Sequence, residues 1–367
     1  MDLKNYFAEK KKLYELALLY LENNEKDNEE LSFQNLIDQT TNQNILNNRE
    51  EFDHFLQMLS KISHNHHRNS EFFNRIKKII IYFINDIKKT YSKNELFDIF
   101  RDNMLILHFL IEQQMLPKES IYNLQFFWPE IKSEKVTIFD ESLLEDDPNI
   151  FNNYQEKQKK GENDSYICSL IREDAIEDFI AYTNRANLQL SSRIKFSIYE
   201  TNQFLLRKEP SLIEYAAFFG SIQICQYLRL NNVELKPSLW LYAIHSNSAE
   251  MIHLLEENHV NAPNNNKFEI CLEEAIKCHH NEIAAYIENN LIVLKKQNES
   301  DFKKTLCEFG FCYSNYSYIT DNFNPFNTFF YLCKYNYNKL VDVYIEKRKN
   351  NLKQERFKYI IKKNYFC

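Results

Sequence analysis

The run YAAFFGSIQICQYLRLNNV at residues 215–233 returns 27 residues later as YAIHSNSAEMIHLLEENHV at residues 242–260. Both runs open on a Tyr-Ala pair, carry two apolar residues near the middle and close on a valine. A third copy, EAIKCHHNEIAAYIENNLI, starts 32 residues after the second, at residue 274, and a shorter fourth copy, YLCKYNYNKLVDVYI, starts at residue 331. The long interval before the fourth copy predicts a degenerate copy at 302–322. A period of roughly thirty residues that holds two short helices is typical of a helical solenoid.

Glycine is scarce, and this excludes several classes of fold and site. The chain has three glycines, Gly161, Gly220 and Gly310, which lie far apart in sequence. Phosphate-binding loops need several glycines within a few residues, because the backbone must approach the phosphate closely. Walker, Rossmann and kinase glycine loops are therefore excluded, and a fold rich in tight β-hairpins is disfavoured. Since 15% of the residues are aromatic, the chain can bury a core, and we expect it to be all-α.

The chain is expected to divide into an N-terminal helical domain and the repeats. Amphipathic patterns fill residues 1–132, where Ser92 and Glu95 have the spacing of a capping box. No helical pattern survives in residues 133–165, which we interpret as a flexible charged linker. The repeats occupy 166–345 and are clearest at 210–236, 237–262, 268–292 and 326–345. Residues 346–367 form a basic segment that we expect to be a capping helix.

The small residues of the repeats resemble those of ankyrin repeats. Ala216, Ala217 and Gly220 stand where the ankyrin pattern has its Ala-Ala pair and the glycine of the following turn. Ala243 and Ala275 take the first alanine position in the next two copies. The resemblance implies that successive repeats pack most closely at these alanines, where only a small side chain fits.

The ends of the repeats also resemble the ankyrin pattern, in which an asparagine and a glycine follow the second helix. Asn231, Asn258 and Asn290 occupy the asparagine position. The glycine is replaced by Asn232 and His259, which tolerate the left-handed conformation, and by Leu291, which tolerates it poorly. We therefore expect the third repeat to end irregularly.

Three longer segments, 211–228, 238–260 and 274–287, are similar to a large family of ankyrin-type proteins from trichomonad protists that carries a domain of unknown function. The resemblance implies a short ankyrin-type solenoid and a non-catalytic role as a protein-protein interaction scaffold or adaptor. It also implies that the two residues after each alanine pair face a concave binding groove. These residues are Phe218, Phe219, His245, Ser246, Lys277, Cys278, Lys334 and Tyr335. Phe218 and Phe219 have two interpretations: an exposed recognition pair, or a pair buried in the repeat or under the N-terminal domain.

No pattern predicts a metal or catalytic site. His64, His66 and His67, followed by Arg68, diverge around a helix, and the neighbours Cys278, His279 and His280 have no second ligand pair nearby. Cys307 and Cys312 have neither the spacing nor the partner pair of a zinc knuckle. Since no nucleophile motif occurs either, an enzyme is the least favoured class, and we expect no cofactor.

The charge pattern gives an alternative function and a compartment. The net charge of −7 provides no general attraction to nucleic acid or anionic membranes. Residues 346–367, however, hold eight basic residues against two glutamates, so nucleic-acid or anionic-membrane association through this segment is the alternative function. Because the N-terminus lacks an apolar signal region and the eight cysteines are scattered, we expect an intracellular protein, in the cytoplasm first and in the nucleus as the alternative.

Overall fold

The computed structural model describes residues 3–23, 28–66, 71–118, 153–206, 208–292, 299–323, 325–346 and 349. Within these residues the chain forms helices and turns and no β-strand, and a single antiparallel bridge joins Arg193 to Ser211. The all-α expectation is therefore confirmed for this part of the chain. His67 and Arg68, residues 133–152 and nearly all of the basic segment 346–367 lie outside the described residues.

The chain forms two compact units, which we call the terminal unit and the central unit. The terminal unit joins Met1–Met58 to Leu294–Cys367, and the central unit is Leu59–Val293. This grouping differs from the boundary that the sequence predicts at 133–165. The reason is a long-range contact that no local pattern reveals: helix α1 (Leu3–Glu22) packs against α22 (Tyr316–Asp321).

The terminal unit is a small helical cluster closed by its own N-terminal helix. It contains α1, α2 (Glu29–Asn42), η2 (Ile45–Asn47), the first part of α3 (Arg49–Asn65), α21 (Glu299–Tyr313), α22, α23 (Pro325–Lys334) and a further helix at 338–346. Phe7 of α1 is fully buried against the rings of Phe311, Phe323 and Tyr337. These aromatic contacts join the two ends of the sequence into one core.

The central unit begins with helices that follow the predicted amphipathic patterns. They are the end of α3, α4 (Phe72–Tyr82), α5 (Ile84–Thr90), α6 (Lys93–Phe100), α7 (Met104–Glu112) and α10 (Tyr154–Lys160). The predicted capping box is present at the start of α6, where the backbone N–H of Glu95 donates to Ser92 Oγ at 3.3 Å and that of Ser92 donates to the Glu95 carboxylate at 2.8 Å.

Residues 153–165 are folded, although the sequence places them in the linker. Gly161 ends α10 in the left-handed conformation (φ 64°), and its carbonyl accepts hydrogen bonds from the backbone N–H and the hydroxyl of Thr201. The amide of Asn163 donates to the Lys195 carbonyl at 2.9 Å. These bonds tie the segment to residues 195–201, and such long-range partners are invisible in the local pattern.

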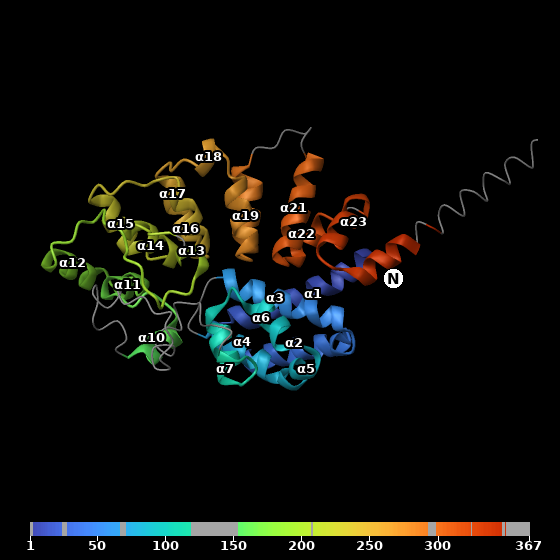
Figure 1. The fold of residues 1–367 in the computed structure, drawn as a ribbon. Coiled ribbons are helices and arrows are strands. Elements are labelled where there is room, and N and C mark those ends of the chain that lie inside the picture. The colour runs from blue at the N-terminus through green and yellow to red at the C-terminus, as the bar shows by residue number, and fades with distance from the viewer. Residues whose placement is uncertain are drawn as a thin grey trace, which may run out of the picture. The chain divides into compact units, whose positions relative to one another are not determined.

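Four helix pairs follow one another in the central unit: α11 (Tyr166–Arg172) with α12 (Ile176–Arg185), α14 (Leu212–Phe219) with α15 (Ile222–Leu230), α16 (Leu239–His245) with α17 (Ala249–Glu257), and α19 (Glu269–Lys277) with α20 (Asn281–Tyr286). The first helices pack in the order α11, α14, α16, α19, and Figure 1 shows the last three along this row. Ala216, Ala243 and Ala275 are fully buried, and Ala217 is buried beside them. Close contact between neighbouring first helices requires such small side chains.

One turn recurs between the two helices of every pair. A residue with φ between 47° and 72° follows the first helix, and these residues are Asp174, Gly220, Asn247, His279, Ser314 and Asn336. In most copies the next N–H donates to the carbonyl five residues earlier, as from Ser221 to Ala216 and from His280 to Ala275. The same bond runs from Asn315 to Gly310 in the terminal unit, between α21 and α22, where the sequence predicts a degenerate copy. Gly310 stands in the alanine position because a Cβ there would lie 2.8 Å from the backbone nitrogen of Ile319.

The asparagines that the sequence predicts lie at the ends of the second helices of the pairs. The side-chain amides of Asn231, Asn258 and Asn290 each donate to the carbonyl four residues earlier. Asn232 and His259 take the left-handed conformation, with φ of 63° and 52°. The third repeat instead ends in a π-helical turn, η5 (Ile287–Leu291), as expected where leucine replaces the permissive residue. Two short helices, α13 (Gln203–Leu206) and α18 (Pro263–Asn266), complete the unit.

Candidate functional site

The predicted partner-binding residues lie in two separate places. Six of them are at the C-terminal ends of α14, α16 and α19 in the central unit: Phe218, Phe219, His245, Ser246, Lys277 and Cys278. The other two belong to the terminal unit. There Lys334 Nζ lies 3.0 Å from Glu308 Oε1, and the ring of Tyr335 stacks on that of Phe311.

Four of the six central side chains, namely Phe218, His245, Ser246 and Cys278, are buried, so they do not face an open groove. Phe204 of α13 covers two of them, because its ring centroid lies 4.2 Å from that of His245 and 6.0 Å from that of Phe218. Phe204 belongs to residues 186–211, a connection between α12 and α14 that is far longer than the turn inside a pair. Of the two interpretations of Phe218, the structure has the buried one.

The end of α3 also takes part in the surroundings of these turns. The ring of His66 meets that of His280 edge-on, with centroids 4.8 Å apart. His66 further lines a cavity of about 10 Å³ together with Phe218 and His245, and this volume is just enough for one water molecule. Residues of the N-terminal helical region therefore border the face that the sequence assigns to partner binding.

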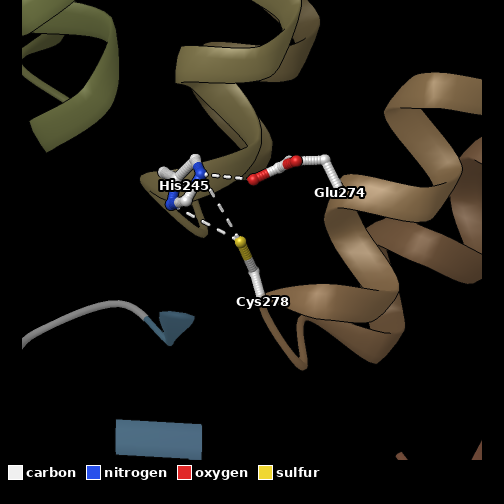
Figure 2. Close-up of side chains that lie close together, drawn as sticks. All are labelled: His245, Glu274 and Cys278. Atoms are coloured by element: carbon white, nitrogen blue, oxygen red, sulfur yellow. Dashed lines mark hydrogen bonds and ion pairs between the residues drawn. The ribbon is translucent and has the colours of Figure 1, made fainter. Parts of the chain in front are cut away.

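Within this face, His245, Glu274 and Cys278 point toward one another from two helices (Figure 2). His245 is the last residue of α16, whereas Glu274 and Cys278 are one helical turn apart on α19 and its C-cap. The imidazole Nε2 of His245 lies 2.8 Å from Glu274 Oε1, and the sulfur of Cys278 lies 3.4 Å from His245 Nδ1. This is the densest group of ligand-type side chains among the described residues.

The protonation states of the cluster follow from its burial and from the charges of Lys277 and Lys208 nearby. Burial opposes ionisation of Glu274, but hydrogen bonds and charge from His245 and Lys277 lower its pKa to about 2. Lys277 Nζ lies 2.9 Å from the same oxygen, Oε1. Burial lowers the pKa of His245 and raises that of Cys278. At neutral pH the imidazole is therefore neutral with Nε2–H donated to Glu274, and Nδ1 can accept the thiol proton of Cys278.

Chemically, the cluster can hold an ion but is poorly placed to attack a substrate. A catalytic cysteine needs the thiolate form and access to its substrate, whereas the Cys278 sulfur is buried and its raised pKa keeps it protonated. Metal binding has no such requirement for an open surface. The ligand atoms of His245, Glu274 and Cys278 all lie within 4.8 Å of one another.

An open groove that was not predicted shares Glu200 with the small cavity beside His245. Its volume is about 320 Å³, and it is formed mainly by the connection that carries α13. Both apolar and charged residues line it, including Ile194, Lys195, Phe196, Glu200, Lys208, Glu209 and Pro210. Phe196 is 49% exposed, and Lys208 Nζ lies 3.7 Å from the ring centroid of Phe204.

Several histidines singled out by the sequence make structural contacts instead. The Nδ1 of His64 lies 2.8 Å from the carbonyl of Asp102, and the Nδ1–H of His280 donates to the carbonyl of Ile244 at 2.7 Å. The sequence prediction tested neighbours of Cys278 and so missed Glu274, which is four residues earlier and on the same helix face. That spacing could have revealed Glu274, but no local signal could have revealed His245, since it belongs to the preceding repeat.

The chain matches no protein-family model, and neither a curated protein nor a solved structure is significantly similar to it. None of the helices in the described ranges is both long and apolar enough to cross a membrane.

Proposed function

We propose that this protein is a non-catalytic interaction scaffold built from ankyrin-type helix pairs, and that it binds another protein. The observation that carries the proposal is the row of first helices α11, α14, α16 and α19, which places equivalent turns of successive pairs next to one another. Such a row is a rigid support, and rigid surfaces bind without a large loss of conformational entropy. Because Phe204 lies over Phe218 and His245, the open surface on this support is the groove beside α13. The buried alanines and the repeated left-handed turns support the ankyrin-type interpretation.

The groove beside α13 is the surface where we place the partner. Phe196 provides an exposed aromatic anchor, and aromatic residues are enriched at the energetic centres of interfaces. Lys195, Lys208 and Glu209 are exposed and also line the groove. This lining suits a protein segment that inserts an apolar side chain and pairs charges of both signs beside it.

The test compares two exposed apolar residues in the full chain. The tagged protein is expressed in cells, and proteins that co-purify with it are identified and quantified for the unmodified chain, Phe196→Asp and Leu230→Asp. Leu230 is 72% exposed at the end of α15 and does not line the groove, so it is the matched control. We expect Phe196→Asp to reduce capture of the partner at least about tenfold, as loss of an interface anchor does, and Leu230→Asp to retain it. Equal capture by all three proteins contradicts the proposed surface, and no specific capture contradicts the scaffold function.

A further inference from the structure

The three converging side chains of α16 and α19 offer the donor types that zinc uses. His245 supplies an imidazole nitrogen, Glu274 a carboxylate oxygen and Cys278 a sulfur. Zn²⁺ is bound in proteins by these ligands, whereas Ca²⁺ and Mg²⁺ take oxygen ligands and disfavour a thiolate. We propose that His245, Glu274 and Cys278 form a zinc-binding site that joins two neighbouring helix pairs. This proposal is independent of the scaffold function.

The backbone brings the ligands together without a flexible loop. Glu274 and Cys278 have the i, i+4 spacing that places two side chains on one face of a helix. His245 comes from the neighbouring helix, α16, which contacts α19 closely because Ala243 and Ala275 are small and fully buried. Ligands on packed helices are held in place before the ion arrives, which favours a specific site.

The distances between the ligand atoms are close to those of a zinc centre. Tetrahedral bonds of about 2.0 Å to nitrogen and oxygen and about 2.3 Å to sulfur separate the ligand atoms by roughly 3.3–3.5 Å. The Cys278 sulfur lies 3.4 Å from Nδ1 and 3.7 Å from Nε2 of His245, so it is nearly equidistant from the two ring nitrogens. Because a metal ion binds along the in-plane lone pair of one nitrogen, the imidazole must turn about its side-chain bonds when zinc enters. The longest separation between ligand atoms, which is at most 4.8 Å, must also shorten.

The charges also suit a divalent ion. Binding releases the thiol proton of Cys278, and the thiolate and the Glu274 carboxylate then neutralise the ion. The ion and its two anionic ligands are then neutral together, and the charge that is left is that of Lys277, whose side chain is 27% exposed and so reaches water.

Zinc needs a fourth ligand, and a small cavity that borders His245, but not Glu274 or Cys278, is the space from which a water could reach the ion. The cavity of about 10 Å³ that borders His245 can hold one molecule, and Glu200 and Asn202 also line it. Three protein ligands with a water in the fourth position are a common arrangement for zinc.

The site is tested with the full-length, reduced and chelator-stripped protein. Cobalt(II) replaces zinc as a spectroscopic probe, and zinc affinity is measured by competition with a chromophoric chelator. We expect one cobalt ion to bind with a thiolate-to-cobalt charge-transfer band and tetrahedral d–d bands, and zinc to displace it. A protein that takes up no ion at micromolar concentration, or a cobalt spectrum without the thiolate band, overturns the proposal.

Two substitutions and one control locate the site on these residues. Cys278→Ser should weaken zinc binding at least about 100-fold, and Glu274→Gln, which keeps the shape of the side chain, at least about tenfold. Cys271 lies on the same helix and is equally buried, so Cys271→Ser is the control and should change the affinity less than about twofold. Circular dichroism without metal checks that each variant is folded, and Glu274→Gln carries the test if Cys278→Ser does not fold. Equal losses in the control and in the ligand variants would show that the ion binds elsewhere.

Discussion

Two buried polar clusters, one in each unit, contain nearly the same residue types and differ in what they can do. In the terminal unit, Glu51 of α3 forms an ion pair with Lys10 and accepts a hydrogen bond from the hydroxyl of Tyr6 at 3.0 Å. In the central unit, Glu274 of α19 forms an ion pair with Lys277 and accepts a hydrogen bond from His245. Each cluster also has a buried histidine, but only the central one brings a thiol to the imidazole.

The difference lies in the balance of donors and acceptors. Lys10 and Tyr6 present protons to Glu51, so their contacts fix α1 against α3 and leave nothing for a ligand to replace. In the central cluster, Nδ1 of His245 and the sulfur of Cys278 face each other with a single proton to share. Residue types alone therefore do not distinguish a structural ion pair from a set of metal ligands. The number of lone pairs that are available to a ligand distinguishes them.

The largest effect is expected from breaking the structural cluster. Lys10 is buried in its ion pair, so Lys10→Met leaves the Glu51 carboxylate buried without its cation. We expect the free energy of unfolding, measured by urea denaturation, to fall by about 3–5 kcal/mol. The double variant Lys10→Met/Glu51→Leu should recover most of the loss, because apolar residues of similar volume replace the whole pair. A loss below about 1 kcal/mol in the single variant would mean that water reaches Glu51.

A second substitution separates the helices that hold the central cluster. Ala243 is fully buried in α16, two residues before His245, where α16 and α19 pack together. Ala243→Leu should lower the free energy of unfolding by about 1–3 kcal/mol through overpacking. Ala285 is an exposed alanine on α20, and Ala285→Leu as the matched control should stay within about 0.5 kcal/mol. Equal melting curves for the two variants would break the alignment of the repeats.

The histidine of the terminal cluster should make stability depend on pH. Burial lowers the pKa of His54 from 6.5 to about 4, with Lys10 adding to this shift and Glu51 opposing it. Below pH 6.5 the unfolded chain therefore takes up a proton that the folded chain does not take up until about pH 4. Stability is thus present above pH 6.5 and is lost as the pH falls, by about 2 kcal/mol between pH 7 and pH 5.

His54→Gln should remove this part of the acid sensitivity in urea unfolding measured across that range. His253 is an exposed histidine, and His253→Gln is the control that should leave the slope unchanged. A slope in His54→Gln equal to that of the unmodified chain would assign the acid sensitivity to other groups.

The helices and the repeats could be predicted from the sequence because they depend on local patterns. Spacing places Ala216, Ala243 and Ala275 at one position, and all three are fully buried. The residue types at 232 and 259 tolerate positive φ, and both adopt it. Such features are set by neighbours within one turn or one repeat, so a single sequence contains them.

The cover of the predicted groove and the central cluster could not be predicted in the same way. Phe204 reaches Phe218 and His245 from a connection without periodicity, and nothing in its neighbours indicates where it folds. Periodicity shows which residues share a face but not what covers that face. For the same reason His245 and Glu274, which belong to different repeats, meet only once the repeats are stacked.

The smallest expected effect is the loss of stability when either of two less buried carboxylates, Glu214 or Glu95, is replaced. Glu214 forms a capping box with Ser211 and also accepts a hydrogen bond at 2.8 Å from Ser238 in the next repeat, and Glu95 forms the same kind of box with Ser92. Both carboxylates are more exposed than Glu51, so their hydrogen bonds compete with water. We expect thermal unfolding to show a loss of about 1 kcal/mol for Glu214→Ala and about 0.5 kcal/mol for Glu95→Ala. The additional loss of stability in Glu214→Ala over Glu95→Ala should vanish when each substitution is made separately in a chain that already carries Ser238→Ala. The reason is that this additional loss comes from the hydrogen bond between repeats. If it persists there, Glu214 stabilises its own helix alone, and the contact between repeats depends on the buried alanines without help from this carboxylate.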